Sequence, residues 1–158
     1  MGHFIGRFLR IIAWLAPFYQ FRASVWRKCG VKVGKGVYIG NLVYFDGEFP
    51  HFITLEDEVS IGPSVLILAH SGASPFHQRT GIFHDPPKPV VIKRGAWLGS
   101  GCIILPGVTI GTGSIVAAGA VVSKNVPDFT TVAGNPARPV AKLPRPGEVN
   151  KTQKESNL

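Results

Sequence analysis

The sequence predicts an all-β fold, a parallel β-helix, from three observations: a six-residue repeat, small residues at a fixed place within it, and an excess of Gly and Pro. The 158 residues are 45% hydrophobic and 16% charged, which is typical of one globular domain. The 19 Gly and 13 Pro are many for that class and indicate numerous tight corners.

The repeat begins near residue 31, where an aliphatic residue starts each six-residue frame. The unbroken register is Ile92, Leu98, Ile104, Ile110, Val116 and Val122. Four residues after each comes a small or β-branched residue: Ala96, Cys102, Val108, Ser114, Ala120 and Val126. An earlier block follows the same rule: Val33, Ile39, Leu55, Ile61 and Ile67. A β-sandwich would alternate apolar and polar residues without this sixfold recurrence.

Each frame is one short strand and one corner, and three frames complete a triangular coil. The first residue of a frame points inward and stacks on the coil below, while the fifth faces inward near a corner and must be small. Gly or another small residue often fills the second place, as in Gly99 and Gly111, and the Gly, Asn and Pro residues of the corners tolerate tight backbone geometry. Each coil buries its face against its neighbours, so stability is close to a sum over stacked repeats.

The segments outside the repeat divide the chain. Residues 1–30 form a helical segment, residues 31–143 the β-helix, with an inserted loop at 71–89, and residues 144–158 a polar tail or strap. The apolar residues of 4–21 follow a helical period, and the uncharged run 11–21 is too short to span a bilayer. This helix either packs on the β-helix or lies on the inner membrane face. Basic residues that would support the second alternative are Arg7, Arg10, Arg22, Arg27 and Lys28.

Charge and cysteine content limit the partners. A net charge of +8 favours anionic partners, but no basic run is interleaved with aromatic residues, which argues against nucleic acid. Cys29 and Cys102 lack metal-ligand spacing and are expected to be core residues of a protein in a reducing cytoplasm.

Three runs carry a resemblance to a known family: ILPGVTIG, VAAGAVVSK and AGNPAR, within residues 95–140. Together with the frames, they resemble the hexapeptide-repeat acyltransferases, and more narrowly the sugar and polysaccharide O-acetyltransferases that include the maltose and galactoside enzymes. The resemblance covers roughly residues 31–143. It implies coils that wind left-handed, a homotrimer, acetyl-CoA as co-substrate and no metal.

Acetyl transfer to a hydroxyl requires a base with a pKa near the working pH, and histidine is the natural choice. His70 ends the frame that starts at Ile67, where the coil gives way to the long loop. It also matches the family pattern in which a strand ending in an aliphatic-small-His run supplies the general base. A solvated histidine at the mouth of a loop is the alternative.

The family pattern places CoA in a groove between subunits. The matching residues here are Ser100, Ala118, Ser123, Lys124 and Arg138. Ala118 would let the pantetheine arm approach the backbone, and Lys124 and Arg138 would meet the nucleotide phosphates. A purely structural role as small corner residues is the alternative for Ala118 and Ser123.

The inserted loop spans a break in the register, since Ile67 and Ile92 are 25 positions apart, which is not a multiple of six. We interpret it as a lid that reaches a neighbouring subunit and contacts the acceptor. The candidate acceptor residues are His77, Arg79, His84 and Asp85. His70, His77 and His84 also suggest a zinc site like that of the gamma-class carbonic anhydrases, but two of them lie in the loop, where ligands lack a rigid support.

The sequence therefore predicts an acetyl-CoA-dependent O-acetyltransferase that modifies a sugar hydroxyl of a cell-envelope polysaccharide or its precursor. The expected location is the cytoplasm, peripheral to the inner membrane face. The alternatives are an N-acetyltransferase of an amino sugar or small amine, and a trimer that is non-catalytic or resembles the gamma-class carbonic anhydrases.

Overall fold

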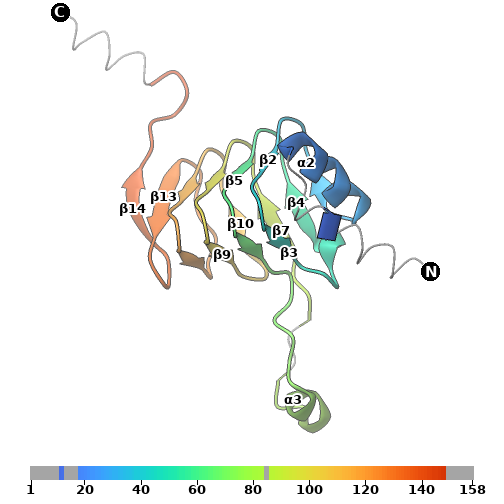
Figure 1. The fold of residues 1–158 in the computed structure, drawn as a ribbon. Helices are drawn as coiled ribbons and strands as arrows, with labels where there is room; N and C mark the ends of the chain where they lie inside the picture. The colour runs from blue at the N-terminus through green and yellow to red at the C-terminus, as the bar shows by residue number, and fades with distance from the viewer. Residues whose placement is uncertain (1–10, 13–17, 84–85, 149–158) are drawn as a thin grey trace, which may run out of the picture.

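The strands wind in successive coils around a triangular prism (Figure 1). A computed structural model describes residues 11–12, 18–83 and 86–148. It confirms the predicted left-handed parallel β-helix with an N-terminal helix and one inserted loop.

Each face of the prism is one sheet. The first holds β1 (Lys32–Val33), β4 (Ile53–Leu55), β7 (Val90–Ile92) and β10 (Thr109–Ile110). The second holds β2 (Tyr38–Ile39), β5 (Ser60–Ile61), β8 (Trp97–Leu98), β11 (Ile115–Val116), β13 (Thr130–Ala133) and β14 (Arg138–Lys142). The third holds β3 (Tyr44–Phe45), β6 (Leu66–Ile67), β9 (Ile103–Ile104) and β12 (Val121–Val122).

The register places residues of the same frame position on one another in successive coils. Ile61 pairs with Leu98, and Leu98 pairs with Val116, so the first residue of each frame lies directly on that of the next coil. The six aliphatic residues of the later register are at most 2% exposed, and the six small residues four positions on are at most 5% exposed. Both predicted inward positions are confirmed.

Both cysteines are buried and outside any disulfide, as expected for core residues. Cys102 lies at an inward position, and burial raises the pKa of its thiol to about 12. It is therefore an uncharged part of the core.

The second-place glycines lie where two coils approach closely. A Cβ on Gly99 would lie 2.5 Å from the amide nitrogen of Ala118 in the next coil. Gly62 and Gly111 meet the backbone of a stacked coil at comparably short distances. These glycines permit close approach of coils, whereas the left-handed backbone geometry occurs at other corner residues, such as Gly101 with φ of 66°.

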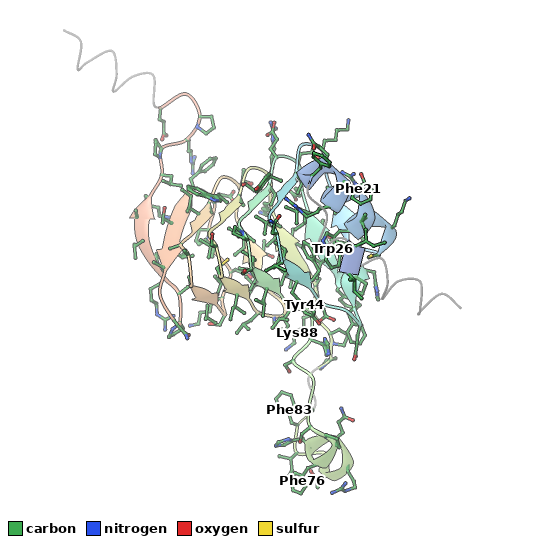
Figure 2. The ribbon with its side chains drawn as sticks, viewed as in Figure 1. Phe21, Trp26, Tyr44, Phe76, Phe83 and Lys88 are labelled. Carbon is green, nitrogen blue, oxygen red and sulfur yellow. The ribbon has the colours of Figure 1, made fainter. Side chains whose placement is uncertain are left out.

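Helix α2 (Tyr19–Lys28) covers the open end of the first coil (Figure 1). Trp26 is buried, and its ring meets that of Phe45 edge-on at 4.8 Å, pointing into the prism in Figure 2.

Arg22 is 3% exposed and donates from Nε to the carbonyl of Ile39 at 2.7 Å, and Arg27 donates to the carbonyls of Val33 and Gly34. Two of the basic residues proposed for a membrane contact thus bind backbone carbonyls of the coil. Arg7 and Arg10 lie outside the described residues.

The inserted loop leaves after β6 and forms an arm that projects from the prism (Figure 1). The short helix η1 (Pro50–Phe52) precedes β4, and the arm carries helix α3 (Pro75–Thr80). Ser74 caps α3 by accepting from the amide of His77, and Gly81 ends it with a φ of 66°. The amide of Lys88 donates to the carbonyl of Ala69 at 2.8 Å and closes the neck of the arm.

The last strand departs from the six-residue rule. β14 turns back and pairs antiparallel with β13, the last parallel strand of the second sheet. It thereby covers a sheet edge that would otherwise expose unpaired backbone groups. Residues 145–148 form a turn in which the amide of Glu148 donates to the carbonyl of Arg145.

We predict that Gly99→Val destabilises the fold by about 1–3 kcal/mol, because its side chain must displace the backbone of the next coil. The urea midpoint at fixed protein concentration measures this. Gly101→Asn is the control: a Cβ there meets nothing within 4 Å, and Asn tolerates the left-handed geometry. Equal midpoints for the two variants would contradict the close-approach explanation.

Candidate active site

His70 stands where the chain leaves the third sheet for the arm. Ala69 before it is fully buried, while the His70 side chain is 24% exposed. The strand β3 of the preceding coil pairs in register with β6, so Phe45 lies on Ile67. The next residue, Asp46, therefore lies beside the point where the chain leaves the coil after β6. The amide of Asp46 donates to the carbonyl of Ile67 at 2.9 Å and holds the two corners together.

The Asp46 carboxylate is the centre of this corner. It is 1% exposed, and its Oδ1 accepts from the amides of Glu48 and Phe49, both at 3.0 Å. Its Oδ2 accepts from the amides of Ala69 and His70 and lies 2.5 Å from Nδ1 of His70. Burial raises the pKa of this carboxyl, but the hydrogen bonds from His70 and the backbone outweigh burial and leave the pKa below its ordinary value.

An ionised Asp46 determines the form of the imidazole. Because the carboxylate can only accept, Nδ1 of His70 must carry a proton. In the neutral ring, Nε2 then has a free lone pair, which is the form that a general base requires. The edge of the Phe49 ring packs against the imidazole at 5.0 Å between centroids and restricts its rotation.

Nε2 lies at a pocket of about 490 Å³ between the prism and the arm. Glu48, Phe49 and His70 form the prism side, and Gln78 and Phe83 come from the arm. Phe83 and Phe76 mark the arm in Figure 2. The pocket is therefore shaped by two segments that the sequence separates by a full coil.

Two of the candidate acceptor residues of the arm, His77 and Arg79, are not among the described residues that line this pocket. Nδ1 of His77 is 2.6 Å from Oγ of Ser74, and the Arg79 guanidinium lies over the Phe76 ring at 5.9 Å. His84 and Asp85 lie outside the described residues. Among the residues that the structure describes, no three His, Cys, Asp or Glu side chains gather as a metal site would require.

The residues expected to bind CoA fall into two groups. Ser100 follows β8 and Ala118 follows β11 at the same corner, where the amide of Gly119 donates to the carbonyl of Ser100 at 2.9 Å. Lys124 and Arg138 line a second pocket of about 290 Å³, and Ser123 lies beside Lys124 after β12. The third sheet separates Ser100 and Ala118 at one edge from His70 at the other.

Sequence reasoning missed Asp46, Glu48 and Phe49. One signal was present: the early frames continue from Ile39 to Phe45, so Asp46 directly follows a first-place residue, as Leu68 follows Ile67. Finding the pair with His70 also required the stacking of two coils in register, which a single frame does not contain.

Comparisons with known proteins agree with this architecture. Residues 89–124 match the family model of the bacterial transferase hexapeptide (six repeats). A Schizosaccharomyces pombe protein, provisionally named an acetyltransferase, is 41% identical over 92 residues, which cover 58% of this chain and 44% of that protein. The chain spans about half the length of the curated relatives it matches.

Solved structures extend the likeness to nearly the whole chain. A hexapeptide-repeat acetyltransferase from Vibrio cholerae superposes with a TM-score of 0.66 and 26% identity, covering 91% of this chain and 92% of that one. A galactoside acetyltransferase in complex with coenzyme A has a TM-score of 0.65 and 24% identity, covering 90% and 81%. The chain thus carries the repeat and the fold of the hexapeptide-repeat acyltransferases, as its sequence predicts.

We predict that Asp46→Asn lowers stability at pH 7 by about 1–3 kcal/mol, because the amide nitrogen cannot accept from backbone amides. The pKa of Asp46 is lowered on folding, so its contribution is complete above the ordinary value of 3.8 and is lost as the pH falls below it. Urea midpoints measured from pH 7 to pH 3 should fall less steeply in Asp46→Asn than in the parent protein. Parallel curves would contradict an ionised Asp46.

Proposed function

We propose that this protein is an acetyl-CoA-dependent O-acetyltransferase that modifies a sugar hydroxyl of a cell-envelope polysaccharide or its precursor, with His70 as general base. The observation that carries the proposal is the buried Asp46–His70 pair, which presents Nε2 to a pocket large enough for a sugar unit. The family resemblance supports acetyl-CoA as the donor.

The reaction follows from the form of the imidazole. Nε2 takes the proton of the acceptor hydroxyl as its oxygen attacks the thioester carbonyl of acetyl-CoA. A carbon–oxygen bond forms, the carbon–sulfur bond breaks, and the proton passes from His70 to the departing CoA thiolate. Asp46 stabilises the imidazolium between these steps, and a backbone amide near the thioester stabilises the oxyanion.

Lys124 follows β12, on the same edge of the third sheet as His70, and is proposed to meet the donor phosphates from the neighbouring chain. The donor itself is proposed to lie along the corner of Ser100 and Ala118, with its phosphates near Arg138. Since the third sheet separates this corner from His70 within one chain, the base and the thioester meet across a boundary between chains. The outward residues of the third sheet form a half-buried apolar row: Tyr44, Leu66, Ile103 and Val121. Copies of the chain covering this row would form the homotrimer that the resemblance implies.

An acceptor attached to a lipid would bring the enzyme to the inner membrane face. Phe18 and Phe21 are 69% and 50% exposed at the start of α2, and Lys28 is exposed at its end. Within the described residues, no helix is long and apolar enough to cross a bilayer. A contact limited to the membrane surface, by a protein of the cytoplasm, fits these residues.

We predict that His70→Ala lowers kcat/KM for acetyl transfer to sugar by about 10²- to 10⁴-fold, because the hydroxyl loses its base. Release of free CoA thiol measures the rate, and calorimetry with CoA shows whether the donor site survives. His51→Ala, which alters an exposed histidine outside the pocket, is the control. Near-normal turnover of His70→Ala would refute the base assignment.

A shared site also predicts complementation between inactive chains. Light scattering should give three times the 17.0 kDa chain mass. Ala118→Trp should block the donor groove, and trimers that mix it with His70→Ala should recover a fraction of the parent activity, because some boundaries are then intact on both sides. A monomer, or mixed trimers that stay inactive, would contradict a site shared between chains.

A further inference from the structure

Glu48 stands over the reactive side of the imidazole. The turn after β3 is held by Asp46, whose Oδ1 accepts from the amides of Glu48 and Phe49, so the position of the Glu48 backbone is fixed. From there, Oε2 of Glu48 reaches to 3.6 Å from Nε2 of His70, while its side chain remains 75% exposed. Asp46 occupies the opposite nitrogen of the same ring.

The charge of the pocket differs from that of the protein. The chain has a net charge of +8, yet the described residues that line the pocket include Glu48 as their carboxylate and neither lysine nor arginine. A carboxylate or phosphate on the acceptor would be repelled by Glu48, and no lysine or arginine among these described lining residues compensates for it. The pocket therefore favours an acceptor group that is neutral and donates hydrogen bonds.

Two hydrogen-bond acceptors lie side by side at the reacting position. Nε2 of His70 and Oε2 of Glu48 can each accept one hydroxyl proton, and 3.6 Å suits two oxygens on neighbouring carbons of one ring. The aromatic rings of Phe49 and Phe83 line the same pocket and can pack on the apolar face of a sugar. When Glu48 holds one hydroxyl, the sugar ring is oriented so that the hydroxyl on the neighbouring carbon contacts Nε2 of His70.

We propose that Glu48 determines acceptor specificity by binding a second hydroxyl next to the one that is acetylated, and that the modified unit is a neutral sugar rather than an acidic one. The inference rests on the proposed O-acetyltransferase activity and names the substrate class of that site. Glu48 positions the sugar ring by accepting a hydrogen bond, while His70 removes the proton from the hydroxyl that is acetylated.

The test compares Glu48→Ala and the parent protein with methyl glycosides of neutral hexoses, their monodeoxy analogues and the matching uronic acids, with acetyl-CoA as donor. For the best neutral glycoside we expect Glu48→Ala to raise KM about 10- to 100-fold, with a smaller change in kcat, which is the effect of losing a hydrogen bond to a charged group. One monodeoxy analogue should show the same loss with the parent protein and no further loss with Glu48→Ala.

Two further variants sharpen the result. Glu48→Gln keeps an acceptor oxygen without the charge, so it should recover part of the affinity for the neutral glycoside and improve transfer to the uronic acid. Glu58→Gln is the matched control, because Glu58 is also an exposed glutamate beside a basic group, Arg94 at 2.8 Å, but lies at another corner of the prism. Unchanged calorimetric CoA affinity shows that each variant is folded.

The outcomes separate this inference from the proposed function. If the parent protein acetylates a neutral glycoside and Glu48→Ala leaves KM unchanged for every acceptor, the role of Glu48 is refuted while the O-acetyltransferase activity stands. If methyl glucosaminide is added to the panel and Glu48→Ala impairs transfer to that amino sugar alone, Glu48 binds an ammonium group and its binding of a second hydroxyl is refuted. If the parent protein binds CoA but acetylates none of the sugars, both proposals fail.

Discussion

The structure depends on the in-register stacking of one coil on the next. Each first-place aliphatic residue rests on its equivalent, as Leu98 does on Val116, and the backbones approach so closely that Gly99 has no space for a side chain. Coils bound in this way have little freedom to slide or rotate, because a shift of one residue would turn every inward side chain outward. The positions of residues just beyond the strands are therefore fixed as well.

That precision makes the chemistry of the corner possible. Asp46 and His70 are 24 residues apart, yet they meet because β3 and β6 are in register. A buried carboxyl would ordinarily be driven towards the neutral form, but the backbone amides and the imidazole that surround Asp46 reverse that tendency. The same carboxylate holds the turn that carries Glu48 and Phe49. One buried group therefore orients the His70 imidazole and shapes the pocket wall beside it.

The prism also places the proposed base and the corner proposed for the donor at different edges of one sheet. A triangular coil places successive corners on different edges of the prism, so Ser100, just before β9, and Leu105, just after it, lie at opposite edges of the third sheet. His70 lies at one edge of the third sheet, and the corner that holds Ser100 and Ala118 lies at the other edge. The arm with α3 extends away from its own prism and exposes Phe76 and Ile82. Both features fit the proposed site between copies of the chain.

The sequence by itself determined the repeat and the inward positions, because both follow from spacing within one or two frames. It offered His70 as the base candidate through its place at the end of a frame and through the family resemblance. Leu98 and Ala96 are buried where their frame places them. Only the tertiary structure decided which residues surround His70. Asp46 and Glu48 belong to the preceding coil, and a single six-residue frame does not reveal which residues of the two coils meet. It also decided that Gly99 serves close packing and that Arg22 binds the core, because both roles depend on backbone atoms of another coil or strand rather than on neighbours in sequence.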